Sequence, residues 1–223
     1  MARADNYSDW TASLFAPYVK GRVLEVGCGV GTYTRLLVER CSPERLMSID
    51  ISSDAIEHCR TRLRHPIVEF KCTDVLNVSG EFDTIVCMNV LEHIADDRSA
   101  LRHMMEMLRP RGTLFLLVPA HNSFFTPWDD ASGHFRRYSK RDVRAMISEV
   151  PDSSRFQVTQ YYFNAIGGLG HFFVFQVLGK APTKSVAGEI GFFDKWIVPV
   201  MRRIEGRRTP FGISLVSVVV RED

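Results

Sequence analysis

The stretch Val23-Leu-Glu-Val-Gly-Cys-Gly-Val-Gly31 decides the fold. It opens with a short, mainly apolar run that is typical of a buried β-strand, and the three glycines after it predict a tight turn. Glycine lets a backbone turn sharply and lets a ligand approach the main chain closely. Apolar residues then recur at helical spacing over 32–40, which predicts a helix. The stretch therefore predicts a strand, a glycine turn and a helix in succession.

The alternation of strands and helices continues to Pro119. The predicted elements are strands at 46–50, 67–72, 83–88 and 113–118, and helices at 53–63 and 97–108. Ser53 is the predicted cap of the first of these helices, and Pro110 and Gly112 are predicted to end the second. Strands that alternate with helices at this spacing predict βαβ units and a parallel, doubly wound sheet.

The chain after Pro119 follows a different pattern. A long loop is predicted over 120–139, because aromatic, charged and turn residues are mixed there without a period. The elements predicted after it are a helix at 139–150, a strand at 155–162, a helical segment rich in Gly and Phe at 164–210, and a last strand at 212–221. We find no internal repeat and no low-complexity tract.

Composition and charge restrict the class of protein. The chain has 223 residues, of which 45% are hydrophobic and 24% are charged, as in soluble globular domains. Disordered and collagen-like chains are therefore excluded. The 28 lysines and arginines against 26 aspartates and glutamates give a net charge of +2, so charge does not indicate a nucleic-acid partner.

The five cysteines and the amino terminus point to a cytoplasmic protein. The cysteines are scattered and form no Cys-x-x-Cys pair, so neither a disulfide framework nor a zinc site is expected, and free thiols suit a reducing compartment. The first ten residues have no apolar core that would indicate a secretory signal. Polar residues and glycines interrupt the most apolar stretch, 161–178, so no membrane span is expected.

The glycine turn departs from the dinucleotide-binding pattern in two ways. That pattern needs its third glycine at position 32, where this chain has Thr32. The carboxylate of Glu25 at the mouth of the turn would repel a pyrophosphate. Both departures favour a cationic or neutral nucleoside over NAD.

Further polar residues follow the next three predicted strands. Asp50 ends the second strand, where a carboxylate can accept hydrogen bonds from both ribose hydroxyls. Asp74 follows the third strand, and Met88-Asn-Val-Leu-Glu-His-Ile94 follows the fourth. Ligands of open α/β sheets bind outside the carboxyl ends of the strands, where these loops meet. Each residue alone is equally well explained as a turn glycine or a surface acid, but their order favours a binding site.

Together, Leu24-Glu-Val-Gly-Cys-Gly-Val-Gly31, Asp50, Asp74 and Asn89-Val-Leu-Glu-His-Ile94 resemble the class I S-adenosylmethionine-dependent methyltransferases of small molecules. The resemblance covers roughly residues 20–160 and the last strand. It implies a Rossmann-like, doubly wound seven-stranded α/β sheet with the last strand antiparallel and a helical insert before that strand. It also implies S-adenosyl-L-methionine as the cofactor, S-adenosyl-L-homocysteine as the product and no metal.

The resemblance implies roles for individual residues of the cofactor site. Glu25 would lie by the methionine ammonium, Asp50 would hold the ribose hydroxyls, Asp74 would hold the adenine amino group and Asn89 would contact the methionine end. The other residues expected to contact the cofactor are Gly27, Cys28, Gly29, Gly31, Ile51, Val75 and Val90.

Missing motifs narrow the class of acceptor. The Asn/Asp-Pro-Pro-Tyr motif of adenine and amide methyltransferases is absent, since Met88-Asn-Val-Leu91 stands in its place. The second glutamate of protein arginine methyltransferases is also absent, and no carboxylate cluster indicates the magnesium site of catechol methyltransferases. A small-molecule acceptor is the interpretation that remains.

The segment Gly133-His-Phe-Arg-Arg-Tyr-Ser139 carries most of the candidates for acceptor chemistry, and it resembles a pattern in a subset of these enzymes. His134 is the first candidate for a base or an acceptor-orienting residue, because histidine takes up protons near neutral pH. His121 is the second candidate. The other predicted catalytic residue is Tyr138, and the predicted substrate-binding residues are Trp10, Arg136, Arg137 and Asn164. The arginines could clamp a carboxylate or instead pair with Asp129 and Asp130.

We expect a single domain over 1–223 with four parts. These are a lid or cap helix at 1–20, a cofactor-binding core at 21–162, a helical substrate lobe at 163–210 and a final strand at 211–223. The residues of the lobe expected to wall an apolar pocket are Phe172, Phe173, Phe175, Phe192 and Phe193. Its basic residues, Lys195, Arg202, Arg203, Arg207 and Arg208, could face an anionic lipid, so a peripheral membrane contact is possible, or could be simply solvated.

Methyl transfer to an oxygen, of a hydroxyl or a carboxylate, is the predicted reaction. It is an in-line displacement in which positioning of the reactants supplies much of the rate. The alternatives are transfer to nitrogen or carbon of a small or lipid-like acceptor, transfer to a nucleic acid, and cofactor binding without transfer. The sequence does not determine the oligomeric state.

Overall fold

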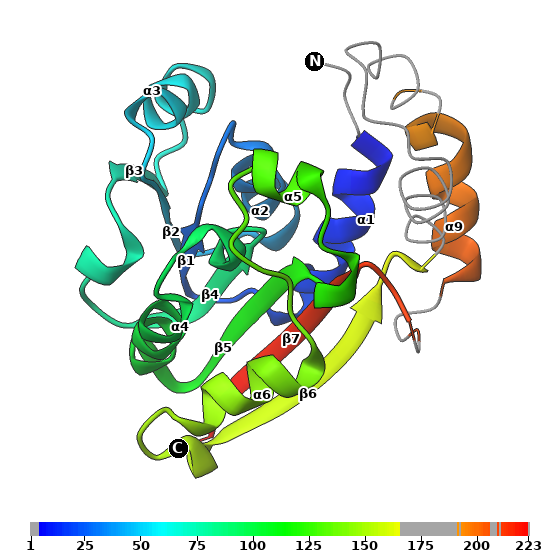
Figure 1. Cartoon of the computed structure of the whole chain (residues 1–223). Coiled ribbons are helices and arrows are strands. Elements are labelled where there is room, and N and C mark those ends of the chain that lie inside the picture. Colours follow the sequence, from blue (N-terminus) through cyan, green and yellow to red (C-terminus); the bar gives the residue numbers. More distant parts are fainter. Residues whose placement is uncertain (1–4, 166–190, 192, 206–208, 210, 223) are drawn as a thin grey trace.

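The computed structural model describes residues 5–165, 191, 193–205, 209 and 211–222. Seven strands in this part of the chain form one sheet in the order β3-β2-β1-β4-β5-β7-β6 (Figure 1). The strands are β1 (Arg22–Val26), β2 (Arg45–Asp50), β3 (Val68–Cys72), β4 (Phe82–Met88), β5 (Leu108–Pro119), β6 (Phe156–Phe163) and β7 (Ser214–Arg221). The predicted α/β sheet of seven strands is confirmed.

The last strand runs against its two neighbours. β7 is antiparallel to β5, with Thr113 opposite Val220, and antiparallel to β6, with Phe156 opposite Arg221. The other pairs, β1 with β2 and β4, β2 with β3, and β4 with β5, are parallel. The predicted antiparallel last strand is therefore confirmed, and the strand order changes direction at β1.

Helices cover both faces of the sheet, as Figure 1 shows. The helices are α1 (Asp5–Phe15), α2 (Thr32–Cys41), α3 (Ser53–Arg62), α4 (Asp97–Glu106), α5 (Pro127–Ala131), α6 (Lys140–Ser148) and α9 (Val198–Ile204). Side chains of α1, α2 and α9 pack in one hydrophobic cluster, and side chains of α4 and α6 pack in another. The single helical turns are η1 (Ala16–Tyr18), η2 (Val75–Asn77), η3 (Leu91–His93), η4 (Asn122–Phe124) and η5 (Ser153–Arg155), and η7 (Phe193–Ile197) is a π-helix.

The central strands bury both of their faces. Leu24 and Ile85 point into the cluster with α4, whereas Val23 and Val86 point into the cluster with α1 and α2. All four side chains are 0% exposed, and each buried aliphatic side chain contributes about 1.5–3 kcal/mol. This burial explains why the strands read as continuous apolar runs, as central strands of parallel sheets do.

Two helix starts follow local capping rules. The hydroxyl oxygen of Ser139 accepts a hydrogen bond from the amide of Asp142, whose carboxylate accepts one from the amide of Ser139, and α6 begins directly after this reciprocal cap. For α3, the cap is Ser52, whose hydroxyl oxygen accepts a hydrogen bond from the amide of Ala55. The predicted cap at Ser53 was therefore wrong by one residue.

Strand β5 is longer than predicted, and the helix before it is shorter. α4 ends at Glu106, and the strand begins at Leu108, which pairs with Phe82. The register shifts after this pair, and Arg111 has a left-handed φ of 62°. The prediction that Pro110 and Gly112 end a helix was wrong, because the irregularity lies inside the strand. A proline is tolerated where the ladder is irregular.

The predicted loop at 120–139 contains the short helix α5. Thr126 caps it, Pro127 is its first residue, and the side chain of Asp129 accepts a hydrogen bond from the amide of Thr126. Proline at the first position and an acid at the third are both helix-start signals. The pattern was therefore present in the sequence, but the helix is only one turn long.

The insert before the last strand is described only in part. Its described residues include the helical segments η7 and α9, which agree with a helical insert. The predicted pocket residues Phe172, Phe173, Phe175 and Phe192, and the basic residues Arg207 and Arg208, lie outside the described residues. Among the helices that the structure describes, none has the length and apolarity needed to cross a membrane.

Candidate active site

The glycine turn after β1 is fixed to the end of β2 by its backbone. The amides of Gly27 and Cys28 both donate to the carbonyl oxygen of Ile49, at 2.9 Å each, and the amide of Gly31 donates to the carbonyl of Cys28 at 2.9 Å. Gly27, Gly29 and Gly31 have φ values of 77°, 51° and 81°. Residues with side chains rarely adopt this left-handed region, so the glycines allow the turn to close.

Two of these glycines have different surroundings. A methyl group at Gly27 would lie 2.2 Å from Cγ2 of Val90, whereas a methyl group at Gly29 would have no atom within 4 Å. Gly27 therefore allows the loop after β4 to pack against the turn. Gly29 instead borders open space, into which a ligand could approach the backbone.

Asp50 presents its carboxylate at the end of β2. One oxygen accepts a hydrogen bond from the amide of Gly29 at 2.8 Å, and the other accepts one from the amide of Ser52 at 2.9 Å. Both bonds hold the carboxylate in place and leave lone pairs for hydroxyl donors. The exposed apolar side chains of the first three loops are Val30, Ile51 and Leu76, at 58%, 78% and 43% exposure.

Glu25 lies in the interior beneath the turn. It is 2% exposed, and one of its oxygens accepts hydrogen bonds from the hydroxyls of Thr34 and Ser48 at 2.6 Å each. Burial raises the pKa of Glu25 to about 7, against the effect of the two hydroxyls. The contact of Glu25 with an ammonium group stays a prediction. A cation near the buried carboxylate would favour its ionised form.

The remaining cofactor candidates lie along the same edge of the sheet. Asp74 is exposed, and its carboxylate accepts a hydrogen bond from the amide of Leu76 at 2.8 Å, while Val75 is 4% exposed. Asn89 is also exposed and has a left-handed φ of 52°, which asparagine tolerates better than most residues. Its amide donates to the carbonyl of Leu117 at 2.8 Å, which ties the loop after β4 to β5.

Asp129 organises the segment after β5. It is 1% exposed, and it accepts hydrogen bonds from Nε and Nη2 of Arg137 and from the amide and hydroxyl of Thr126, at 2.8–2.9 Å. Burial opposes its ionisation, but the bonds from Arg137 and Thr126 outweigh burial and lower the pKa of Asp129 to about 2. Asp129 is therefore ionised and can only accept hydrogen bonds.

His134 is oriented by this carboxylate. Its Nδ1 lies 2.9 Å from Oδ1 of Asp129. Because the carboxylate can only accept, Nδ1 carries a proton, and a neutral imidazole in this tautomer has its lone pair on Nε2. The His134 ring meets the ring of His93 edge to face, with 4.7 Å between centroids. The side chain of His134 remains 18% exposed, so it is held but not enclosed.

The loop after β4 brings Glu92 and His93 to this place. The amide of Phe135 donates to the carbonyl of Glu92 at 2.8 Å, which joins the loops after β4 and β5. Glu92 is 0% exposed, and neither of its carboxylate oxygens has a hydrogen-bond partner among the described residues. Burial raises the pKa of Glu92 to about 8. An unpaired buried carboxylate is costly.

Three predicted acceptor residues have protein partners. Tyr138 is 2% exposed, and its hydroxyl donates to Asp97 at 2.9 Å. Arg136 pairs with Asp97, and Arg137 is buried in its pair with Asp129. The alternative in which Arg137 fixes the loop through Asp129 is the one that the structure contains. Tyr138 and both arginines therefore support the segment, and their catalytic and substrate-binding roles stay predictions.

His121 lies in an aromatic group at the end of β5. Its ring stacks on Phe211 with 5.2 Å between centroids and lies 4.7 Å from the ring of Tyr162. Its Nε2 has no hydrogen-bond partner among the described residues, and burial lowers the pKa of His121. The amide of His121 donates to the carbonyl of Tyr138 at 3.0 Å, and its catalytic role stays a prediction.

Trp10 and Asn164 lie near each other at the end of β6. Trp10 is 4% exposed, with its ring 4.5 Å from that of Phe163, and Asn164 is 6% exposed, with its amide nitrogen 3.5 Å from the hydroxyl of Tyr7. Both side chains are covered by protein, so α1 packs on the sheet as a cap. Their role in substrate binding stays a prediction.

The sequence did not single out Glu92, His93 and Asp129 as a group. Glu92 and His93 lie in η3, in the loop after β4, and Asp129 and His134 lie in the loop after β5. Since parallel β4 and β5 are neighbours, their loops meet at the carboxyl edge. A signal was therefore available in the pair Glu92-His93 at a strand end, once the strand order was known.

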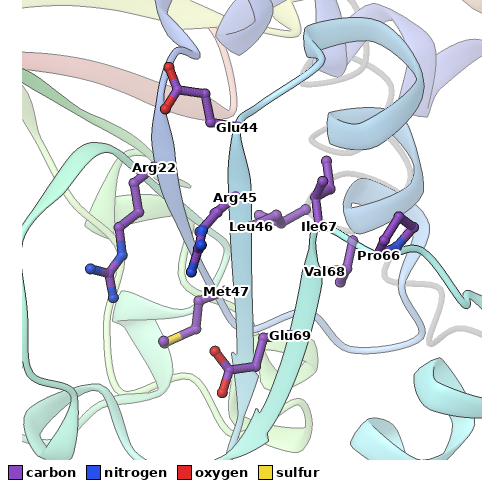
Figure 2. A pocket seen from close by; sticks show the side chains of 9 residues that line it. All are labelled: Arg22, Glu44, Arg45, Leu46, Met47, Pro66, Ile67, Val68 and Glu69. Atoms are coloured by element: carbon purple, nitrogen blue, oxygen red, sulfur yellow. The ribbon is translucent and has the colours of Figure 1, made fainter.

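A large hollow lies elsewhere, beside β2 and β3. It has a volume of about 540 Å³ and is lined by Arg22, Glu44, Arg45, Leu46, Met47, Pro66, Ile67, Val68 and Glu69 (Figure 2). Arg22 begins β1, whereas the glycine turn follows the end of that strand. The hollow is therefore at the opposite end of β1 from the polar groups described above.

The family model described as "Methyltransferase domain" matches residues 2–159. Among curated proteins, the chain is 26% identical over 136 residues to malonyl-[acyl-carrier protein] O-methyltransferase of Acetivibrio thermocellus, covering 60% of this chain and 46% of that protein. It is 35% identical over 103 residues to the mitochondrial ubiquinone biosynthesis O-methyltransferase of Saccharomyces cerevisiae, covering 42% and 32%. The chain thus spans less than half the length of these relatives.

Solved structures share the fold over nearly the whole chain. A Haloferax volcanii methyltransferase in complex with the activator Trm112 has a TM-score of 0.65 and 19% identity, with 99% of this chain and 96% of that chain covered. The N-methyltransferase NodS of Bradyrhizobium japonicum with S-adenosyl-L-homocysteine has a TM-score of 0.59 and 18% identity, with 98% and 86% covered. Given the match of the family model to most of the sequence, the chain belongs to the methyltransferase domain family, and its resemblance to the class I S-adenosylmethionine-dependent methyltransferases is confirmed.

Proposed function

We propose that this protein transfers a methyl group from S-adenosyl-L-methionine to an oxygen of a small molecule. The observation that carries the proposal is the hydrogen bond between Asp129 and His134 in the loop after β5. This loop is bonded to the loop after β4, which contains η3. In that second loop, Val90 packs against the glycine turn. A nucleoside site and a side chain able to accept a proton thus belong to adjoining loops. The family and the curated O-methyltransferases support the reaction type.

The residues at the first three strand ends fit the cofactor. Gly29 borders open space, which leaves room for a ligand along the backbone. Asp50 has lone pairs for the two ribose hydroxyls, and the exposed side chains of Ile51 and Leu76 offer apolar contacts to a flat base. Asp74 is exposed and could accept a hydrogen bond from an amino group. The cofactor, when bound, supplies an electrophilic methyl group on a sulfonium.

His134 would act on the acceptor. The bond to Asp129 fixes the tautomer with the proton on Nδ1, so that Nε2 can accept a hydrogen bond from an acceptor hydroxyl and then take its proton. A hydroxyl needs such help, because it is a weak nucleophile while it is protonated. The contribution expected of a positioned general base is about 10²–10⁴-fold in rate.

Transfer to nitrogen is the second candidate. The observation in its favour is the shared fold with the N-methyltransferase NodS over 98% of this chain. A protonated amine would also have to give up a proton before it attacks the methyl group, and Nε2 of His134 could accept that proton. The two candidates therefore differ in the product and not in the residues that act.

The experiment that tests the proposal has two stages. Calorimetric titration with S-adenosyl-L-homocysteine, with NAD as the control ligand, should show micromolar binding of the first and none of the second. Transfer from methyl-labelled S-adenosyl-L-methionine to a panel of hydroxy, carboxy and amino acceptors is then followed by mass spectrometry. A product methylated on oxygen supports the first candidate, and one methylated on nitrogen supports the second.

Two histidine variants separate catalysis from folding. His134→Gln should bind S-adenosyl-L-homocysteine as the wild type does and lose transfer by at least about 10²-fold. His65→Gln, at an exposed histidine after α3, is the matched control and should keep both properties. Unchanged transfer in His134→Gln would remove the proposed role of this residue. Absence of S-adenosyl-L-homocysteine binding in the wild type would remove the proposed reaction.

A further inference from the structure

Glu92 is a buried carboxylate without a partner. It is 0% exposed, and neither Oε1 nor Oε2 forms a hydrogen bond within the part of the chain that the structure describes. Buried polar groups are nearly always paired, so each exception calls for an explanation. A carboxylate in this situation needs either a proton or a cation.

Two imidazoles lie beside this carboxylate. One ligand atom each from Glu92, His93 and His134 lie within 4.8 Å of one another, and the two rings meet edge to face at 4.7 Å. The three residues come from the loops after β4 and β5, which the bond from the amide of Phe135 to the carbonyl of Glu92 holds together. Three donor groups of the kinds that bind metal ions therefore converge on one point.

Both rings are fixed in the tautomer that suits a metal ligand. Nδ1 of His93 lies 3.2 Å from the carbonyl oxygen of Gly133, and Nδ1 of His134 lies 2.9 Å from the carboxylate of Asp129. A carbonyl and an ionised carboxylate only accept, so both Nδ1 atoms carry protons and both Nε2 atoms keep a lone pair. Metal-bound histidines almost always donate their other nitrogen to a carboxylate or a backbone carbonyl in this way.

We propose that Glu92, His93 and His134 bind a divalent first-row transition-metal ion, with Asp129 as the positioning residue of His134. Two imidazoles and one carboxylate are the donor set that such ions share, whereas Mg²⁺ and Ca²⁺ favour oxygen ligands alone. This site is contrary to the expectation from the sequence that the protein holds no metal. Metal–nitrogen distances of about 2.0–2.1 Å require the three atoms to draw closer, and His93, which is exposed, has room to turn.

Three protein ligands leave at least one position of the ion open. In catalytic sites this position holds water or a substrate oxygen. The inference concerns ion binding alone and does not rest on the proposed function. The two roles of His134 Nε2 exclude each other in one molecule, because a lone pair bound to an ion cannot accept a proton.

Titration with Co²⁺ and Zn²⁺ tests the site without any cofactor or acceptor. The purified full chain, freed of affinity-tag histidines and treated with a chelator, is titrated with Co²⁺ by visible absorption and with Zn²⁺ by calorimetry. We expect one ion per chain, a Co²⁺ absorption band from bound nitrogen ligands, and displacement of Co²⁺ by Zn²⁺. A hundredfold excess of Mg²⁺ should not displace the Co²⁺.

Single variants assign the ion to these residues. His93→Gln changes an exposed side chain and should lower the affinity for Co²⁺ by at least about tenfold, and Glu92→Gln should do the same. His65→Gln should bind as the wild type does. Melting curves show whether each variant is folded, and His93→Gln keeps the test valid even if Glu92→Gln does not fold. Less than one ion per chain, or equal affinity in His93→Gln and the wild type, would overturn the proposal and leave Glu92 as a protonated buried acid.

Discussion

The two halves of the carboxyl edge of the sheet are built in different ways. After β1 and β2, backbone amides form most of the contacts: amides of the glycine turn donate to the carbonyl of Ile49, and the amide of Gly29 donates to the carboxylate of Asp50. After β4 and β5, side chains hold the segment: Asp129 binds His134 and Arg137 within the loop after β5, and the amide of Phe135 joins that loop to the carbonyl of Glu92. Both halves join the loops of neighbouring strands, but the first is built mainly from backbone groups, whereas the second is built mainly from buried polar side chains.

The largest effect is expected at the centre of the second half. Asp129→Ala removes the partner of the buried Arg137 and should destabilise the fold by about 3–5 kcal/mol, because a buried charge is left unpaired. The free energy of unfolding in urea measures this. Asp130→Ala, at the exposed neighbour in α5, is the matched control and should cost less than about 0.5 kcal/mol.

The same variant tests whether the halves are independent. In folded Asp129→Ala, binding of S-adenosyl-L-homocysteine should stay close to that of the wild type, since the glycine turn does not depend on Asp129. Equal stability of Asp129→Ala and Asp130→Ala would contradict the central position given to Asp129. Loss of nucleoside binding in a folded Asp129→Ala protein would show that the halves are coupled.

A methyl group at Gly27 should break the first half. Gly27→Ala forces a side chain into a left-handed conformation, at about 1–2 kcal/mol, and 2.2 Å from Val90, at about 1–3 kcal/mol more. We expect a lower melting temperature and loss of S-adenosyl-L-homocysteine binding by calorimetry. The double variant Gly27→Ala/Val90→Ala should recover part of the stability, because it removes Cγ2. If the double variant is no more stable than Gly27→Ala, the destabilisation comes from the left-handed backbone conformation alone and not from the contact with Val90.

The buried carboxylate of Glu25 should make stability depend on pH. Burial raises its pKa from 4.5 to about 7, so the folded protein keeps a proton that the unfolded chain releases. Ionising the buried carboxylate therefore lowers the free energy of unfolding. This loss is absent below pH 4.5, grows between pH 4.5 and 7 and is complete above pH 7, where it is about 3 kcal/mol. Glu25→Gln removes this loss, so its stability relative to the cofactor-free wild type should rise with pH across that window.

Chemical unfolding at pH 5 and pH 8 measures the Glu25 effect. Other titrating groups are the same in both proteins, so the difference between them isolates this carboxylate. Parallel stability curves for Glu25→Gln and the wild type would show that Glu25 titrates at its ordinary pKa, as an exposed acid does.

The smallest effect is expected at the cap of α3. Ser52→Ala removes the acceptor of the bond from the amide of Ala55 and should cost about 1 kcal/mol in unfolding free energy. Ser53→Ala, one residue later, should cost almost nothing. The reverse order of these two variants would restore the cap at Ser53 that the sequence predicts.

The fold was predictable from the sequence because its signals are local. The glycine turn, the apolar runs of the strands and the serine at the start of α6 depend on a few consecutive residues. The errors in the fold arise where distant contacts decide. β5 begins at Leu108 because that residue pairs with Phe82. The cap of α3 is a local exception: two serines stand side by side, and Ser52 rather than Ser53 accepts the bond from the amide of Ala55.

The candidate site was predictable only in its first half. Gly27 and Asp50 lie where the glycine spacing and the strand ends indicated, although their roles in cofactor binding stay predictions. In the second half, His134 was selected by residue type, but its orientation by Asp129, five residues earlier, depends on how the loop after β5 folds. Tyr138 was a catalytic candidate by type as well, yet its hydroxyl is buried on Asp97. Residue type does not show which polar groups are already hydrogen-bonded to other residues of the protein.

The antiparallel strand β7 has a consequence for synthesis on the ribosome. It lies between β5 and β6, but it is made after both of them. The facing edges of β5 and β6 therefore lack a partner while roughly 50 residues between Phe163 and Ser214 are made, which takes roughly 3–10 s at about 5–20 residues per second. Unpaired strand edges favour pairing with other chains, so the nascent protein is open to misassembly and to chaperones during this interval.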